Sequence, residues 1–297
     1  MMQLQYLPSR AGVLFMRLIA PLPLPLIRGM GWLFGWLLYG LAYSRRHVVH
    51  TNLTLCFSEH SAQEIRGLMP KIFIYFAQSW LDRSWLWHGS PALRAKRLQL
   101  TGAAPDLASS STPTVLFAPH FMGLDAGWSA LNTQLAPTRS FSTIYAAQSN
   151  AIVDAWILQG RQQPSQARLF SRSEGVREIA ASLKAGVPLY LLPDMDLGAA
   201  HSVFVPFFGV RAATVPSLPR FAKLGGAQVR SVLSMLTPQG YSIHISAPWR
   251  DYPSGDLTAD TARMNRELQT MIEQSPAQYY WVHKRFKTRP PGEASVY

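Results

Sequence analysis

The amino-acid sequence predicts an α/β fold, in which a mixed, mostly parallel sheet is flanked by helices and preceded by an N-terminal membrane-anchoring helical segment. Short apolar runs, such as residues 115–118 and 187–192, alternate along the chain with amphipathic segments of helical length. This alternation is typical of a sheet with helices on its faces. The chain has 297 residues, enough for one large α/β domain, and residues 14–43 are almost wholly apolar.

Residues 1–45 are predicted to form the membrane anchor, and residues 46–297 a single folded domain. The cleanest apolar stretch, residues 29–43, would make a helix of about 22 Å, shorter than a hydrocarbon core of roughly 30 Å. Prolines at positions 21, 23 and 25 would kink or break a longer helix, so we expect a kinked span or a re-entrant element. Arg45 and Arg46 follow directly, which predicts that the rest of the chain is cytoplasmic. The alternative is a hydrophobic helical hairpin buried within the protein.

Hydrophobic periodicity and capping residues predict the remaining elements. Ser61 and Glu64 have the spacing of a capping box, and Gly186 follows the predicted end of another helix. Residues 101–113, rich in small residues and proline, are interpreted as a connection. The last two strands are expected to form an antiparallel edge. The predicted helices are residues 47–55, 61–69, 72–87, 126–135, 151–162, 176–184, 218–224 and 258–274. The predicted strands are residues 115–118, 141–145, 187–192, 228–236 and 241–246, with 168–171 as a short strand or turn.

The balance of charge indicates an anionic partner. The formal net charge is +12 and the isoelectric point is near 10.1, which suits nucleic acid, acidic lipid or an acidic carrier protein. Sequence signatures of nucleic-acid binding are missing, so no nucleic-acid partner is expected. A membrane surface and an acidic protein fit the apolar composition better. The single cysteine, Cys56, excludes an internal disulfide and fits a reducing compartment.

A histidine with a carboxylate five residues later follows the first predicted strand of the core. His120 comes directly after Pro119, and the carboxylate is Asp125. An imidazole can exchange a proton near pH 7, and a nearby carboxylate can orient the ring and stabilise its charged form. Within one helix the two side chains would lie about 140° apart, so the pair requires a turn, with Asp125 near the start of the next helix. The alternative is a structural loop histidine beside an N-capping aspartate.

Two further carboxylates, Asp194 and Asp196, follow the strand predicted at 187–192. Ligands of open α/β sheets bind beyond the carboxyl ends of the strands, so Asp194 and His120 are expected at the same edge. Carboxylates at this spacing resemble the Mg²⁺- or Mn²⁺-binding pair of nucleotide-sugar glycosyltransferases. They could instead be turn residues. Serine hydrolysis is disfavoured, because the nearest match to a nucleophile elbow, residues 127–131, lacks the final glycine.

Six blocks of sequence follow one another along the chain: residues 45–52, His120-x-x-x-x-Asp125, Asp194-Met-Asp196-x-Gly198, and residues 203–209, 212–214 and 278–290. In these blocks and in their order, residues 12–292 resemble the late lipid A acyltransferases of Gram-negative bacteria. This resemblance implies a fold similar to that of glycerolipid acyltransferases, with residues 46–297 as the catalytic domain. It also implies transfer of an acyl chain from acyl carrier protein to a hydroxyl of a lipid A precursor, on the cytoplasmic side of the inner membrane, without a cofactor or metal.

The resemblance also implies roles for four residues. His120 would act as general base and Asp125 would orient its ring, while Arg161 and Asp194 would bind substrate. Arg161 would bind a phosphate or stabilise developing charge, with Asp194 holding its geometry. One departure concerns Tyr145, which many family members follow with a basic residue and this chain with Ala146. Residues 203–209 are expected to line a lipid groove or to pack in the core, and the basic residues 283–289 to bind anionic groups.

Three alternatives remain open from the sequence. The first is a membrane-associated, metal-dependent glycosyltransferase that uses Asp194 and Asp196. The second is a lipid-binding or assembly subunit with a structural His120. The third is an acyltransferase that acts on another glycolipid or metabolite.

Overall fold

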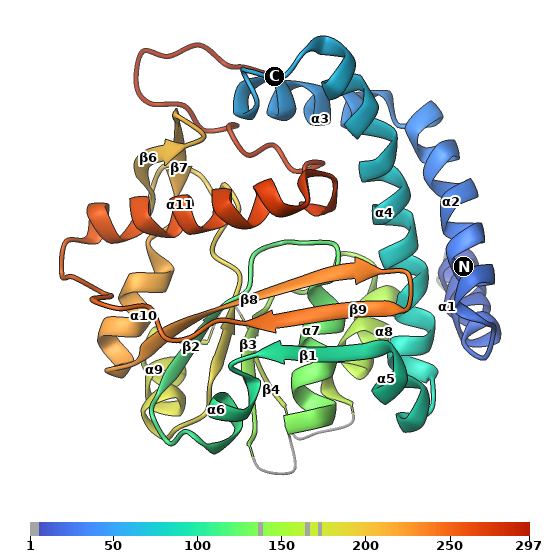
Figure 1. Cartoon of the computed structure of the whole chain (residues 1–297), viewed down its shortest axis with the longest axis horizontal. Helices are drawn as coiled ribbons and strands as arrows, with labels where there is room; N and C mark the ends of the chain where they lie inside the picture. The colour runs from blue at the N-terminus through green and yellow to red at the C-terminus, as the bar shows by residue number, and fades with distance from the viewer. Residues whose placement is uncertain (1–5, 136–138, 164–166, 172–173) are drawn as a thin grey trace.

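The computed structural model describes residues 6–135, 139–163, 167–171 and 174–297. Seven strands within these ranges form one sheet. Its order is β1-β9-β8-β2-β5-β3-β4 (Figure 1). Strands β8, β2, β5, β3 and β4 run parallel, whereas β9 is antiparallel to β8 and β1 is parallel to β9. These strands are Leu98–Gly102 (β1), Thr114–Phe117 (β2), Ser142–Tyr145 (β3), Arg168–Ser171 (β4), Leu189–Leu191 (β5), Gln228–Thr237 (β8) and Gly240–Ile245 (β9).

The sheet confirms the predicted mixed, mostly parallel α/β architecture. Val115 pairs with Leu189 on one side and with Val229 on the other, and all three are fully buried. A strand covered on both faces has no need of polar alternation, which explains its continuous apolar sequence. The antiparallel pair β8–β9 does not form the edge of the sheet as predicted, because β1 lies beyond it. The edge strand β1 ends just inside residues 101–113, which are interpreted as a connection, and the short helix α6 (Ala104–Ser109) lies within them.

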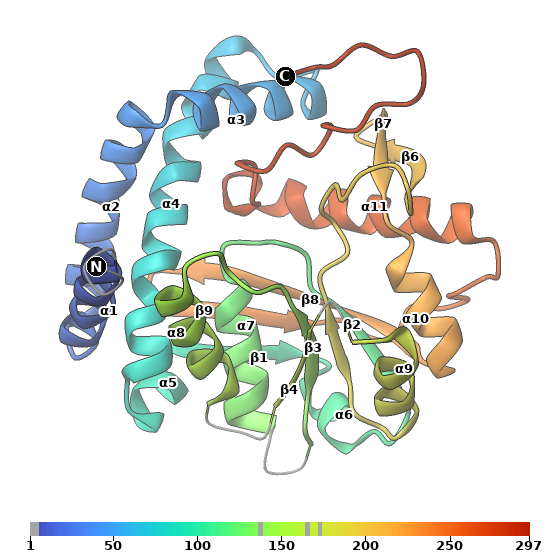
Figure 2. The same cartoon turned by 180° about the vertical axis from the view of Figure 1, so that it is seen from behind.

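Helices cover the sheet on both faces, as the view from behind also shows (Figure 2). Two helices have the predicted bounds, and each begins at a residue suited to a helix start: Asn150 caps α8 with its side chain, and Gly175 precedes α9. The helices are α5 (Pro91–Arg97), α7 (Leu124–Ala130), α8 (Ala151–Gln162), α9 (Val176–Lys184), α10 (Ser217–Gly225) and α11 (Leu257–Gln274).

The N-terminal region folds against the domain as a set of packed helices. They are α1 (Leu7–Ile19), α2 (Leu24–Leu41), α3 (Tyr43–Cys56) and α4 (Ala62–His88). Helix α2 lies along the outer side of α4 (Figures 1 and 2). At the contact, a Cβ added to Gly35 would lie 2.4 Å from Cα of Ile74, so only glycine allows this approach. Arg28 of α2 forms a 2.8 Å ion pair with the buried Asp82 of α4.

The prediction of a membrane-anchoring segment in residues 1–45 is not supported. No helix within the described ranges combines the length and the apolar character needed to cross a bilayer. The prolines divide the apolar stretch between α1 and α2, and Arg28 is paired within the fold. Residues 1–5 of the expected anchor lie outside the described ranges. The outer face of α2 nevertheless exposes large apolar side chains, among them Trp32, Leu33 and Leu37.

Candidate functional site

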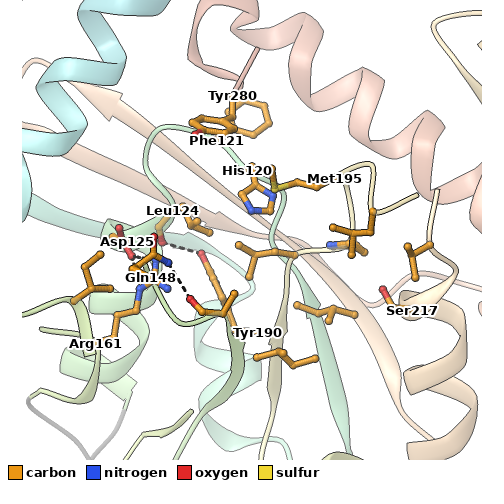
Figure 3. A pocket seen from close by; sticks show the side chains of 18 of the residues that line it. His120, Phe121, Leu124, Asp125, Gln148, Arg161, Tyr190, Met195, Ser217 and Tyr280 are labelled. Atoms are coloured by element: carbon orange, nitrogen blue, oxygen red, sulfur yellow. Dashed lines mark hydrogen bonds and ion pairs between the residues drawn. The ribbon is translucent and has the colours of Figure 1, made fainter. Parts of the chain in front are cut away.

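A cavity of about 630 Å³ lies beyond the carboxyl ends of strands β2, β5, β3 and β4 (Figure 3). Its wall includes His120 after β2, Gln148 after β3, and Met195 after β5. Helices α4, α7 and α8 also contribute to the wall, as does Tyr280 from the segment after α11. The parallel strands therefore bring to one edge residues that are far apart in the sequence, as expected for an open α/β sheet.

His120 is paired with Asp194. Its Nδ1 lies 2.8 Å from Oδ1 of Asp194, and its backbone N–H donates to Oδ2 over 3.0 Å. The Asp194 side chain is fully buried, and the His120 side chain is 21% exposed. Burial opposes ionisation of Asp194, but the charge of His120 and its hydrogen bonds outweigh this, so the pKa of Asp194 lies below its usual value.

The pairing fixes the roles of the two ring nitrogens. An ionised carboxylate only accepts hydrogen bonds, so Nδ1 of neutral His120 carries the proton and Nε2 has the free lone pair. No described residue bonds to Nε2, and the ring forms part of the cavity wall. This arrangement is suited to a general base that takes a proton from a molecule in the cavity.

Asp125 does not have the predicted partner. Its Oδ1 accepts a hydrogen bond from Nε of Arg161 at 2.9 Å and lies 2.8 Å from Nη2 of the same ion pair, and its Oδ2 accepts a hydrogen bond from Nε of Arg83 at 2.7 Å. Burial alone would raise the pKa of Asp125, but the charges of Arg161 and Arg83 lower it to about 2. The two aspartates have thus exchanged the expected positions: Asp194 orients the histidine, and Asp125 holds Arg161.

Arg83 is a member of the site that no sequence motif marked. It lies on α4 with its guanidinium 4.0 Å from the ring centre of Trp80, and its buried Nη1 has no partner among the described residues. Arg161 comes from α8 and lies 5.7 Å from the ring centre of Tyr145. Two guanidinium groups share one carboxylate, so this part of the cavity wall carries an excess of positive charge. The only available signal was the spacing of Arg83 from Trp80 and Trp87, which also fits core packing.

The carboxylates of Asp194 and Asp196 do not form a shared metal-binding pair. Oδ1 of Asp196 accepts hydrogen bonds from Gly198 N–H at 2.9 Å and Thr288 Oγ1 at 2.8 Å, and Oδ2 accepts one from Thr288 N–H at 2.6 Å. Asp194 is bonded to His120 and to the hydroxyl of Tyr279. Within the described ranges, no group of three or more His, Cys, Asp or Glu side chains has an arrangement that could hold a metal ion.

The segment after α11 closes the site. The Met122 N–H donates to Gln278 O at 2.8 Å, and the Tyr280 N–H donates to His120 O at 3.0 Å. His283 accepts a hydrogen bond from the N–H of Asp196 on Nε2 at 3.0 Å. Burial, together with the charge of nearby Arg285, lowers the pKa of His283 to about 4, so the ring is neutral.

The residues 283–289, expected to bind anionic groups, are largely engaged within the fold. Arg285 and Phe286 are buried, and His283 is bonded to the loop after β5. Residues 203–209 do not line the main cavity either. They form the strand β6 (Val203–Phe207) and the turn to β7 (Val210–Thr214), and the side chains of Val205 and Phe207 pack in the interior.

Comparison with known proteins identifies the relatives of this chain. Residues 1–288 match the family model described as bacterial lipid A biosynthesis acyltransferase. The chain is 30% identical over 291 residues to a lipid A biosynthesis lauroyltransferase of Escherichia coli (strain K12), covering 96% of this chain and 92% of the relative. It is 27% identical over 291 residues to the palmitoleoyltransferase of the same strain, with the same coverage. It is also 27% identical over 277 residues to the myristoyltransferase of that strain, covering 92% of this chain and 83% of the relative.

Proposed function

Because this chain belongs to the bacterial lipid A biosynthesis acyltransferase family, we propose that it transfers an acyl chain from an acyl carrier protein thioester to a hydroxyl of a lipid A precursor, with His120 as general base. The chain is an O-acyltransferase of lipid A biosynthesis, so the glycosyltransferase and non-enzyme alternatives are not supported. The observation that carries the proposal is the His120–Asp194 pair, which leaves Nε2 available beside the cavity.

The proposed reaction needs one base and no covalent acyl-enzyme. Nε2 of His120 removes the proton of the acceptor hydroxyl while its oxygen attacks the thioester carbonyl carbon. The tetrahedral intermediate then collapses, the carbon–sulfur bond breaks, and the leaving sulfur receives the proton from Nε2. Asp194 holds the ring throughout and stabilises the imidazolium that forms between these two proton transfers.

Arg83 and Arg161 are proposed to bind the phosphate of the acceptor. Guanidinium groups match phosphate oxygens in geometry and in charge. Asp125 neutralises part of their mutual repulsion and holds both side chains in the cavity wall. The position after Tyr145, where many relatives carry a basic residue, is occupied here by Ala146, which lines the same cavity. Arg83 would supply the second cation from another element.

The remaining wall of the cavity is mainly apolar and is proposed to hold the acyl chain. Ile179, Leu192 and Phe221 belong to it, from α9, the loop after β5 and α10. Each methylene group that moves from water into such surroundings contributes about 0.8 kcal/mol of favourable free energy.

We further propose that the protein acts at the cytoplasmic face of the inner membrane, where it binds through α1 and α2 without spanning the bilayer. Leu14, Leu18, Leu33 and Leu37 are exposed on these helices, and Arg10 and Arg17 are exposed on α1. Apolar side chains beside basic ones favour an anionic lipid surface. The net charge of +12 also favours an acidic carrier protein as the donor.

The direct test uses purified protein, lauroyl-, myristoyl- and palmitoleoyl-acyl carrier protein, and a lipid A precursor with a free hydroxyl. Mass spectrometry of the lipid identifies the acyl chain added. Replacement of His120 by Ala is expected to lower kcat by about 10²–10⁴-fold, the contribution typical of a general base, in a protein that circular dichroism shows to be folded. His244→Ala, at an exposed histidine of β9, is the matched control. Near-normal turnover by His120→Ala would overturn the proposed mechanism, and acylation only of a different glycolipid would overturn the proposed acceptor.

A further inference from the structure

Tyr279 is a buried tyrosine whose hydroxyl contacts Asp194 of the His120–Asp194 pair. The hydroxyl donates to Oδ2 of Asp194 over 3.0 Å, while Oδ1 of the same carboxylate faces the ring of His120. Tyr279 is 4% exposed, and it does not line the cavity. Its role therefore cannot be direct contact with substrate.

The backbone around Tyr279 is attached to the loop that carries His120. Phe121 and Tyr279 form an isolated antiparallel bridge, and the hydrogen bonds of Gln278 and Tyr280 to this loop flank it. The side chain of Gln278 is bonded to both backbone groups of Leu236 in β8. The backbone that carries Tyr279 is thus anchored both to the sheet and to the loop of His120.

We infer that Tyr279 is a positioning residue for acyl transfer, which fixes the carboxylate of Asp194 and limits its basicity so that His120 can release as well as accept a proton. This inference rests on the proposed function. A carboxylate that accepts a hydrogen bond from a neutral donor is less basic than one without it. The hydroxyl of Tyr279 therefore weakens the stabilisation of the imidazolium by Asp194. The imidazolium can then give its proton more easily to the leaving sulfur.

Other ionisable groups near the pair do not offer a competing explanation. Burial and the charge of Asp194 raise the pKa of Tyr279 far above neutrality, so its hydroxyl stays a donor. His283 has a pKa of about 4, to which burial and the charge of Arg285 both contribute. Tyr280 lies with its ring 6.2 Å from that of His120. Asp125, with a pKa of about 2, is paired with Arg83 and Arg161 in the same cavity.

The test replaces Tyr279 by Phe and measures acyl transfer to the lipid A precursor from pH 5 to 9. Without the hydroxyl, Asp194 becomes more basic and favours the charged form of His120. The midpoint of the acid limb of the kcat profile is expected to move to higher pH, and kcat to fall about tenfold, the loss of one hydrogen bond to a charged group. KM for both substrates is expected to stay unchanged.

Incorporation of 3-fluorotyrosine at position 279 gives a second variant with almost the same shape. Fluorine makes the phenol a stronger donor, so the midpoint is expected to move to lower pH. Tyr252→Phe is the matched control, because Tyr252 is buried and its hydroxyl has no hydrogen-bond partner among the described residues.

Three outcomes separate this inference from the function on which it rests. Opposite shifts of the midpoint in the two variants, with Tyr252→Phe unchanged, support it. A midpoint that stays in place in both variants, or moves in the same direction in both, overturns it even if kcat falls. Retained activity in His120→Ala, measured in parallel, overturns the proposed function itself.

Discussion

At the scale of single residues, Asp194 determines which nitrogen of His120 can act. It binds Nδ1 through Oδ1 and the backbone N–H of the same residue through Oδ2, so both the ring and the loop are held by one side chain. An asparagine at this position would bring an amide of either orientation to Nδ1 and would lack the negative charge that stabilises the imidazolium. The carboxylate is therefore important both for the tautomer and for the charge of the ring.

Asp125 contributes to the stability of the fold, as the difference between its pKa values in the folded and unfolded protein indicates. Its pKa of about 2 in the folded protein lies below the value of about 3.9 for an aspartate in an unfolded chain. Between about pH 2 and pH 4, Asp125 therefore binds a proton more readily in the unfolded chain than in the folded protein. The pair of arginines around Asp125 contributes about 2 kcal/mol of stability above pH 5, and this contribution disappears as the pH falls through 4 to 2.

Asp125→Asn should remove this contribution. The free energy of unfolding at pH 7 is expected to fall by about 2 kcal/mol, and its decline between pH 5 and 2 should become shallower, as measured by urea unfolding at each pH. KM for the lipid acceptor should rise, because Arg83 and Arg161 lose their shared anchor.

Asp251→Asn is the control for this variant. Asp251 is exposed and has a positive φ of 53°, which asparagine also tolerates. An Asp125→Asn protein whose stability depends on pH as steeply as the wild type would show that the arginines do not stabilise the carboxylate.

At the scale of elements, the packing of α2 on α4 depends on two glycines. A Cβ at Gly31 would lie 2.6 Å from Cγ and 2.8 Å from Cα of Gln78, and one at Gly35 would lie even closer to the backbone of Ile74. Helix α2 also carries Gly29, where an added Cβ would have no atom of another element within 4 Å. The helix is therefore close to its partner along one side only, and its exposed side is free to contact another surface.

Gly35→Ala is expected to lower the free energy of unfolding by about 1–3 kcal/mol, because the added methyl group forces the two helix backbones apart. Gly29→Ala provides the matched control on the same helix. It should be neutral or raise stability by up to about 1 kcal/mol, since alanine has the higher helix propensity. Chemical denaturation measures both. Equal effects of the two substitutions would show that the close contact with α4 contributes nothing.

Several elements were predictable from local sequence, and others were not, for identifiable physical reasons. The bounds of α8 and α9 follow from their periodicity and from the residues that start and end them. Helix α4 was expected as two helices, because Pro70 lacks an N–H for the helix interior. Packing on both sides of α4 outweighs this cost and keeps the helix continuous through Pro70. Strand β1 has mostly exposed residues and shows only a weak alternating pattern.

In the candidate site, too, some features could be predicted from the sequence, and others depend on contacts between distant segments. His120 and Asp194 follow strands of one sheet, so their common edge could be predicted from topology. Which carboxylate meets the ring could not be predicted, because that depends on the path of two loops. Arg83 and Tyr279 come from elements outside the sheet. No motif marks Arg83, and the block 278–290 contains Tyr279 without indicating its contact with Asp194.

At the scale of the whole molecule, helices α1 and α2 lie on the side of α4 away from α11 (Figures 1 and 2), and both carry exposed large apolar side chains. The double substitution Leu33→Gln with Leu37→Gln should weaken binding to vesicles of anionic phospholipid by at least roughly tenfold, because two leucine side chains no longer leave water. Flotation of the protein with the vesicles measures this.

Leu224→Gln, at an exposed leucine of α10, is the control for the double substitution. Acyl transfer to an acceptor dispersed in detergent should be the same in all three proteins, because none of these leucines lines the cavity. Unchanged flotation of the double variant would exclude this face as the membrane-binding surface.

The bonds between the loops of the site and the segment 278–288 also have a consequence for the synthesis of the protein on the ribosome. A ribosome completes the sheet strands β2 and β5 long before it translates Tyr280 and Thr288, which bond to the loop after β2 and to the loop after β5. A nascent chain therefore has the histidine but lacks the groups that align it. The proposed acyl transfer therefore requires that the last of these residues has emerged and folded back.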